Sequence, residues 1–427
     1  MKILLTGATG FIGSHLAPAL TCAGHRVVAA QRRPSRASEY VIADFSRDHA
    51  DEIWEERLAG FDAVINAVGI IREQGDQTFD ALHTRAPRGL FAACAHVGIS
   101  KVIQISALGA PSGVTPYFAS KHAADEFLAS LPVAWTIVYP SLVYGTEGAS
   151  AQLFETLASL PLIPLPGEGL QRLQPVHIDD VVAAIVAAVS SQSVGHQRIA
   201  LVGPEAFSLR DYLATLRRSM ELGRPHFIHV PMPLVRAAAS AATRTGVGLL
   251  DRNTLTMLNA GNVADAGAIE RLLQRPPRSA DEFIDARQAR SAGITAVLRW
   301  MLPLVRLSIA IVWLWSGITS FGLYPRELSY DMLSASFIPA AWQPPVLVAA
   351  ASLDVLLGIA TLALRRRQML WLLQIAVMGT YTLIISATLP DLWLHPFGPV
   401  LKNLPTLAAI LLLYCLEPLT ERSQWNT

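Results

Sequence analysis

Tyr117 and Lys121 are the side chains in this sequence whose types and spacing best suit proton transfer. They stand four residues apart in the run Tyr117-Phe118-Ala119-Ser120-Lys121. On a helix this spacing places both side chains on one face, so their polar ends can reach the same small volume. A phenol ordinarily titrates at about 10, and a neighbouring ammonium favours the phenolate, which brings the group toward acid–base use near neutral pH. The alternative is an exposed helical pair without a function.

Three glycines near the start of the chain form a second pattern with a chemical use. Gly7, Gly10 and Gly13 lie between an apolar run, Ile3–Leu5, and an amphipathic stretch, Ser14–Cys22. Strand, glycine turn and helix in this order make a phosphate cradle, because the turn is tight and the helix N-terminus offers free N–H groups. The turn therefore predicts a nucleotide site, and a plain turn without a ligand is the alternative. The residues that we expect to hold the nucleotide are Gly7, Thr9, Gly10, Phe11, Ile12 and Gly13.

Arg32 and Arg33 bear on the choice of nucleotide. They follow the second expected strand, Arg26–Ala30, where an acidic residue would bind the ribose 2′-hydroxyl of NAD(H). Arginine suits a 2′-phosphate instead. We therefore expect NADP(H) rather than NAD(H), unless both arginines are ordinary solvated loop charges.

Together these patterns resemble the short-chain dehydrogenase/reductase family, in its extended and atypical branches. The resemblance implies that Tyr117 is the general acid–base and that Lys121 tunes it and holds the nicotinamide ribose. It implies that Ser106 polarises the substrate carbonyl or hydroxyl. The further residues that it places around the cofactor are Asp44 beside the adenine, Asn66 and Ala67 in Asn66-Ala67-Val68-Gly69, and Pro140 in Pro140-Ser141-Leu142-Val143-Tyr144-Gly145.

The serine position departs from the pattern of that family. Ser106 is followed by Ala107 and Leu108 and stands only eleven residues before Tyr117. Ser112 or Thr115 are the alternatives for its role. The departure resembles the atypical branch that includes the 39-kDa subunit of respiratory complex I, in which a nucleotide is bound without obvious catalysis. Turnover is therefore less firmly indicated than cofactor binding.

The alternation of apolar runs and helical stretches over the first 140 residues predicts a doubly wound parallel sheet. Its expected strands are Ile3–Leu5, Arg26–Ala30, Ala63–Asn66, Lys101–Ser106 and Trp135–Tyr139. We expect a small substrate lobe built mainly from residues 141–175 and 204–286. Asp179 and Asp180 precede the helical run Val181–Val189, so they are interpreted as helix caps rather than metal ligands. No metal site is expected.

The composition points to the bilayer rather than to nucleic acid. Charged residues make up 16% and apolar residues 52% of 427 residues, and the formal net charge is only +1. Four apolar runs follow residue 301, and the first three approach the length that spans about 30 Å of hydrocarbon. These runs are 302–324, 346–364, 369–389 and 400–416. The arginines cluster at residues 287–299 and 365–367, so we expect those segments, the nucleotide domain and the C-terminus on the cytoplasmic side of the inner membrane.

The four apolar runs resemble the DoxX-like four-helix membrane family. The resemblance rests on Ser316–Ser320 and on His395–Asn403. Asp354 lies within the second run, where a carboxylate is costly and should face a partner. Lys402 is one candidate partner, and a protonated packing residue is the equal alternative.

The sequence thus predicts three parts: an NAD(P)-binding domain over 1–286, a basic linker over 287–301 and a membrane domain over 302–427. We expect a membrane-anchored NAD(P)H-dependent oxidoreductase that transfers hydride to a lipid-soluble substrate, such as a quinone precursor, an isoprenoid or a lipid. The alternative is a non-catalytic assembly factor or redox sensor that binds the same nucleotide. The expected partners are the nicotinamide nucleotide, the bilayer and a respiratory or quinone-pathway protein.

Overall fold

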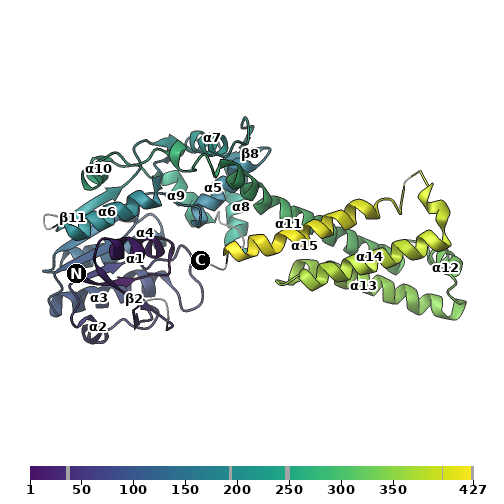
Figure 1. Cartoon of the computed structure of the whole chain (residues 1–427), viewed down its shortest axis with the longest axis horizontal. Helices are drawn as coiled ribbons and strands as arrows, with labels where there is room; N and C mark the ends of the chain where they lie inside the picture. Colours follow the sequence, from purple (N-terminus) through teal and green to yellow (C-terminus); the bar gives the residue numbers. More distant parts are fainter. Residues whose placement is uncertain (35–38, 192–194, 246–250, 397, 425–427) are drawn as a thin grey trace. The chain divides into compact units, whose positions relative to one another are not determined.

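The computed structural model describes the whole chain except residues 35–38, 192–194, 246–250, 397 and 425–427 (Figure 1). The described residues divide into two compact units, Met1–Ala296 and Val297–Asn426. The first unit contains the expected sheet, and the second contains the expected apolar helices.

The first unit is organised around a seven-stranded parallel sheet with the order β11-β6-β5-β4-β1-β2-β3. All five expected strands are present, and their ends differ from the expected ones by a residue or two. Ile3 pairs with both Val27 and Ala63, so β1 lies inside the sheet. The strands are β1 (Lys2–Thr6), β2 (Arg26–Gln31), β3 (Tyr40–Ile42), β4 (Ala63–Asn66), β5 (Lys101–Ile105), β6 (Trp135–Pro140) and β11 (Gln197–Leu201).

Helices cover both faces of this sheet, which explains why its central strands are mainly apolar. Leu4 packs with Trp54 and Leu90 on one face, whereas Ile3 and Leu5 pack into a second cluster on the other. The first face carries α2 (Asp51–Leu58), α3 (Ala86–His96) and α4 (Pro116–Ala129), and the second carries α1 (Phe11–Cys22), α6 (Ile178–Ser190) and α10 (Gly267–Leu273). The doubly wound fold predicted from the sequence is confirmed.

A smaller lobe has its own core within the first unit. Phe154, Leu165 and Tyr212 meet there with Phe283, and the first turns of α11 pack on the same cluster through Ala289 and other alanines. The lobe contains α5 (Ala149–Ser159), α7 (Leu209–Ser219), α8 (Met232–Thr245), α9 (Arg252–Ala260) and the short strands β7 (Val143–Tyr144), β8 (Ile163–Pro166), β9 (Arg172–Leu173), β10 (Val176–His177), β12 (Phe207–Ser208) and β13 (Phe227–Val230).

The second unit consists of helices. Within the described residues, three helical segments are long and apolar enough to cross a membrane: Ala289–Leu323, Ala340–Ala363 and Gln368–Thr388. The apolar part of the fourth, Asn403–Pro418, is shorter. The long helices are α11 (Ala289–Ile318), α13 (Gln343–Ala363), α14 (Gln368–Thr388) and α15 (Asn403–Gln424), and a short helix, α12 (Arg326–Ala335), lies between the first two.

The stretch expected as a basic linker, 287–301, is not a separate element. Helix α11 begins at Ala289 and runs without a break to Ile318. Ala289 and Ala296 are buried in the core of the lobe, and Leu302 is buried in the core of the second unit. Arg290 and Arg299 of this stretch therefore lie on a helix.

Candidate nucleotide and catalytic site

The glycine turn between β1 and α1 has a geometry that only glycine allows at two of its three positions. Gly7 has a φ of +69°, and a Cβ there would lie 2.6 Å from the Ala67 carbonyl oxygen. A Cβ on Gly13 would lie 2.1 Å from the Gly7 carbonyl oxygen. These contacts bring β1, α1 and the end of β4 close together, which is the packing that a phosphate-binding turn needs.

Gly10 occupies the N-cap of α1 and differs from the other two glycines. It is exposed, as is Thr9, and no side chain caps the helix at this end. Helix α1 begins at Phe11, three residues earlier than expected from the sequence, so the N–H groups of its first turn, including those of Phe11 and Ile12, have no intrahelical acceptor. These N–H groups and the positive end of the helix dipole suit a phosphate.

Asn66 ends β4 as expected, but its side chain is fully buried within the sheet. Its Oδ1 accepts a hydrogen bond of 2.5 Å from Thr6, and its Nδ2 donates one of 2.7 Å to Gln104. The amide therefore ties β1, β4 and β5 together behind the glycine turn. Ala67, which approaches Gly7 through its carbonyl group, borders the turn directly.

The residues expected at the adenine end lie beyond β2 and β3. Arg32 and Arg33 are exposed immediately after β2. Asp44 follows β3 and accepts hydrogen bonds from the backbone N–H and the hydroxyl of Ser46, at 3.0 and 2.7 Å. Burial alone would raise the pKa of Asp44, but these bonds and the charges of Arg32 and Arg47 lower it. The Asp44 carboxylate and the Arg32 guanidinium are thus near each other, at the place where the family resemblance puts the adenosine of the nucleotide.

Tyr117 lies in the first turn of α4 within an aromatic pocket. The ring centroids of Phe79, His83 and Phe118 lie 5.9, 5.4 and 5.5 Å from that of Tyr117. Thr115 caps this helix by accepting from the Phe118 N–H, which fixes the entry of the chain into α4. The side chain is therefore held by its ring, as a positioned proton donor requires.

Lys121 is buried one turn further along α4. Its Nζ donates hydrogen bonds of 3.1 Å to the carbonyl oxygens of Val68 and Ile105, which lie at the ends of β4 and β5. Burial lowers the pKa of Lys121 to about 8, although the nearby Asp125 carboxylate opposes this shift. The lysine thus lies at the carboxyl edge of the sheet, where open α/β sheets bind ligands.

The pKa of Tyr117 moves opposite to the direction expected from the sequence. Burial raises it to about 12, and the negative charge of Asp125 acts in the same direction. The charge of Lys121, which was expected to lower this pKa, does not counteract these two effects. Tyr117 is therefore a neutral phenol at physiological pH, which is the form that donates a proton.

Ser106 points into the protein. Its hydroxyl donates a hydrogen bond of 2.5 Å to Oδ2 of Asp125, and both residues are buried. Burial raises the pKa of Asp125 to about 6, with partial compensation by the Ser106 hydrogen bond and the charge of Lys121. The two candidate replacements also serve local structure, because Ser112 bonds to the Gly109 carbonyl and Thr115 is the cap of α4.

His83 was not identified from the sequence, although it forms one wall of the Tyr117 pocket. Its Nε2 accepts from the Ile70 N–H at 3.0 Å, and its Nδ1 lies 3.0 Å from the Ser120 hydroxyl. Burial and the charge of Lys121 lower the pKa of His83 to about 2, so the ring is neutral and carries its proton on Nδ1. Ser120 in turn donates to the Tyr117 carbonyl oxygen at 2.9 Å, so His83 positions the start of α4.

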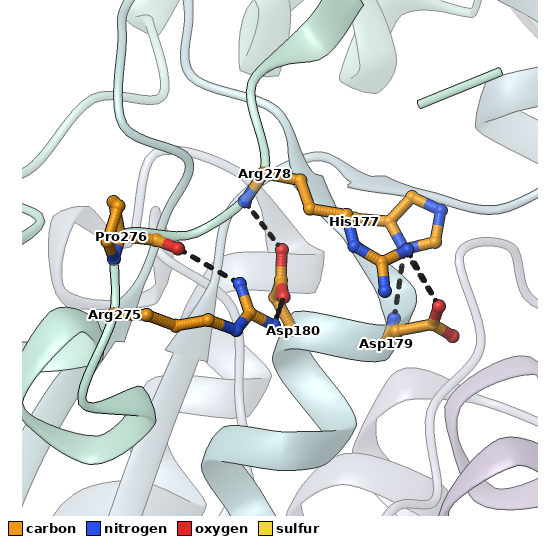
Figure 2. Close-up of polar contacts among 6 residues, drawn as sticks. All are labelled: His177, Asp179, Asp180, Arg275, Pro276 and Arg278. Atoms are coloured by element: carbon orange, nitrogen blue, oxygen red, sulfur yellow. Dashed lines mark hydrogen bonds and ion pairs between the residues drawn. The ribbon is translucent and has the colours of Figure 1, made fainter. Parts of the chain in front are cut away.

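Asp179 and Asp180 do not cap α6 as expected. His177 is the N-cap, and its Nδ1 accepts from the Asp179 N–H at 3.2 Å (Figure 2). Asp180 is fully buried, pairs with the Arg275 guanidinium and accepts from the Arg278 N–H at 2.8 Å. Asp179 and Asp180 thus fasten the segment that contains Arg275 and Arg278 to the start of α6.

A cavity of about 480 Å³ lies beside this cluster. His15, Gly145, His177, Arg278 and Phe283 are among its lining residues. A Cβ on Gly145 would lie 2.8 Å from the Phe11 ring, so the cavity borders the first turns of α1. Neither Tyr117 nor Lys121 lines this cavity. Pro140, the other expected cofactor residue, is buried at the end of β6 and accepts from the Leu108 N–H.

The two parts of the chain match two known families. Residues 3–203 match the NAD dependent epimerase/dehydratase family, and residues 310–411 match the DoxX-like family. Both resemblances drawn from the sequence are therefore confirmed. The chain carries an epimerase-like nucleotide-binding domain of the short-chain dehydrogenase type together with a DoxX-like membrane domain.

Individual relatives resemble the nucleotide domain. The mitochondrial NADH dehydrogenase [ubiquinone] 1 alpha subcomplex subunit 9 of Arabidopsis thaliana is 33% identical over 254 residues, which cover 55% of this chain and 61% of that protein. This chain thus spans less than two thirds of the plant subunit. The ceramide reductase of Caulobacter vibrioides is 25% identical over 56% of this chain and 76% of that enzyme. The UDP-glucuronic acid 4-epimerase of Bacillus cereus, solved with UDP-glucuronic acid and NAD, shares the fold with a TM-score of 0.52 at 20% identity, over 68% of this chain and 98% of that one.

Proposed function

We propose that this protein is a membrane-anchored NAD(P)H-dependent reductase whose substrate is lipid-soluble and carries a carbonyl group. The observation that carries the proposal is the placement of Tyr117 and Lys121 on α4, with the Lys121 ammonium at the ends of β4 and β5. The glycine turn contacts Ala67 directly after β4, so the phosphate cradle and the acid–base pair share one edge of the sheet. A quinone precursor, an isoprenoid or a lipid fits such a site in a chain that also carries a membrane domain.

The state of Tyr117 favours reduction over oxidation. Its raised pKa keeps the phenol protonated, and a carbonyl oxygen must receive a proton when it becomes a hydroxyl. A nicotinamide nucleotide held at the glycine turn would supply the hydride that the carbonyl carbon receives. Tyr117 donates its hydroxyl proton to the carbonyl oxygen, and the phenolate then takes a proton from water. Lys121 lies one turn further along α4 and would hold the nicotinamide ribose.

The lipid-soluble substrate is supported by the membrane domain and by the name of one relative. A reductase tethered to the bilayer meets substrates that partition into the bilayer more often than substrates in water. The Caulobacter relative is named for a ceramide, which is a lipid. This relative is 25% identical, so its name supports a lipid as the class of substrate and does not identify the compound.

The second candidate function is a nucleotide-binding assembly factor or redox sensor that does not turn over. The observation that favours it is the Ser106 hydroxyl, which is committed to Asp125 and so does not polarise a carbonyl. The name of the plant relative, a subunit of NADH dehydrogenase, is consistent with such a role and with a respiratory partner.

Nucleotide consumption separates the two candidates. We expect the full-length protein in detergent to oxidise NADPH when an organic lipid extract of its host is added, because the substrate partitions into that phase. The water-soluble extract of the same cells is the control and should give no oxidation above background. The proposal is wrong if NADPH is bound but remains unoxidised with the lipid extract, or if only the aqueous extract supports oxidation.

We also propose NADP(H) as the preferred nucleotide, because the two exposed arginines after β2 suit a 2′-phosphate. Replacing Arg32 and Arg33 together by serine should weaken NADPH binding by about 10-fold or more, since each charged hydrogen bond contributes roughly 1.5–3 kcal/mol. NADH binding should change little, because NADH lacks that phosphate. Parallel titrations with the two nucleotides measure the difference, and equal losses for both would show that these arginines do not read the phosphate.

A further inference from the structure

The membrane domain buries polar side chains that play no part in the proposed reductase chemistry. Asp354, Thr361, Gln374 and Glu417 are each at most 5% exposed, and they lie on α13, α14 and α15. Polar and ionisable groups within membrane-spanning helices are costly and are usually retained for a function. Their arrangement therefore calls for a physical explanation.

These side chains follow the inward seams of the helices. On α14 the residues Trp371, Gln374 and Met378 are buried at spacings of three and four, and on α13 Asp354, Leu357 and Thr361 repeat the same spacing. Such a heptad pattern marks the side of a helix that faces its neighbours in a bundle. The polar groups thus point into the bundle rather than toward lipid.

Polar contacts join the helices at three successive levels. At one end Arg306 and Glu417 form an ion pair, and Trp371 Nε1 donates to Glu417 Oε2 at 2.9 Å. Gln374, one turn along α14, donates to the Thr361 hydroxyl at 2.7 Å. Thr361 and Asp354 are seven residues apart on α13, a rise of about 10 Å. At that level the Ser316 hydroxyl of α11 donates to Asp354 Oδ2 at 2.7 Å.

Three buried polar atoms of this seam have no hydrogen-bond partner among the described residues. They are Asp354 Oδ1, Gln374 Oε1 and Trp313 Nε1. Trp313 stands one turn from Ser316 on α11, and Leu314 beside it contacts the position of Gly358, which lies between Asp354 and Thr361. One donor and two acceptors, on α11, α13 and α14, are therefore unpaired. Unpaired buried polar atoms of this kind are ordinarily satisfied by bound water or by a proton.

Asp354 also has no compensating positive charge. Among the ion pairs of the described residues none includes Asp354, and Lys402, the partner considered from the sequence, does not bond to it. The polar groups that interact with its carboxyl group are Ser316 on α11 and Tyr381 on α14, both neutral. The nearest charged pair along the seam, Arg306 and Glu417, neutralises itself. An isolated carboxylate in this setting would be strongly unfavourable, whereas the neutral acid is not.

We propose that Asp354 is a proton-binding site of the membrane domain. The ligand is the proton. Only the O–H bond of this carboxyl group forms or breaks. The site does not depend on nucleotide binding or on turnover in the first unit.

Infrared spectroscopy tests the proton site directly, because a protonated carboxylic acid has a carbonyl band that a carboxylate lacks. The full-length protein in phosphatidylcholine vesicles should show this band, and Asp354→Asn should remove it. Ser316→Ala is the matched variant: it keeps the acid and should shift the band to higher frequency through loss of one hydrogen bond. The proposal is overturned if the wild-type band is missing or if Asp354→Asn leaves it unchanged.

Access of this proton to solvent is tested by the shift of the same band after transfer to D₂O. We expect the band of the wild-type protein to shift. A band that never exchanges would show that Asp354 is only a buried packing residue.

Discussion

Replacing Gly10 by aspartate should weaken nucleotide binding by about 100-fold or more, because like charges brought together cost several kcal/mol. The added carboxylate would stand at the N-terminus of α1, where the free N–H groups and the helix dipole otherwise attract phosphate. Gly10 has ordinary extended backbone angles, with a φ of −80° and a ψ of 171°, so aspartate can adopt them. Aspartate is also a favourable N-cap residue, so the helix should not lose stability.

Two measurements on the full-length protein decide this prediction: a titration with NADPH and the thermal unfolding temperature. Gly10→Asn is the matched control, since asparagine has nearly the same shape and capping ability without the charge. It should lose less affinity than Gly10→Asp, and both variants should unfold close to the wild-type temperature. Gly13→Ala could not serve, because its Cβ would collide with the Gly7 carbonyl oxygen. Wild-type affinity in Gly10→Asp would place the nucleotide away from this turn.

The features that sequence reasoning located are those set by local spacing. The strand before Gly7, the turn and α1 are neighbours along the chain, so composition and periodicity determine them together. The same holds for Tyr117 and Lys121, which a single helix places on one face. The apolar helices of the second unit could also be predicted from the sequence, because a membrane span is a continuous run of apolar residues.

The features that could not be predicted from the sequence depend on contacts between residues that are distant in the chain. Ser106 is committed to Asp125, nineteen residues later, and this pairing rather than the short Ser106–Tyr117 spacing explains the altered role of the serine. Burial and the same Asp125 raise the pKa of Tyr117, which a view limited to Lys121 could not anticipate. The role of His83 could not be predicted from the residues next to it in the sequence. It depends on the contacts of its two ring nitrogens with Ile70 and Ser120.

Charged residues were the other source of error, since a carboxylate before a helix suits both a cap and an ion pair. Asp180 lies in the first turn of α6, yet burial against Arg275 and Arg278 gives it a tertiary role, and His177 takes the cap. The arginines before the first span suggested a linker, but α11 begins at Ala289 within that stretch and tolerates Pro303.

Replacing Tyr117 by phenylalanine should lower turnover by about 10²–10⁴, the usual contribution of a positioned acid. The substitution keeps the ring and its contacts with Phe79 and His83, so nucleotide affinity and thermal stability should stay near wild-type values. Lys121→Ala should reduce both turnover and affinity, because this side chain would also hold the nicotinamide ribose. Ser106→Ala should affect turnover far less than Tyr117→Phe, since its hydroxyl faces Asp125.

Transfer of deuterium from NADPH labelled at C4 to a molecule of the lipid phase is the measurement that tests the reductase most directly. Mass spectrometry of the extracted lipids should find one deuterium in the product for each nucleotide oxidised by the wild-type protein. With Tyr117→Phe the label should appear at a rate lower by about 10²–10⁴, while NADPH still binds. The account is contradicted if NADPH binds to both proteins and no deuterium reaches the lipid phase, or if the label appears equally fast with either.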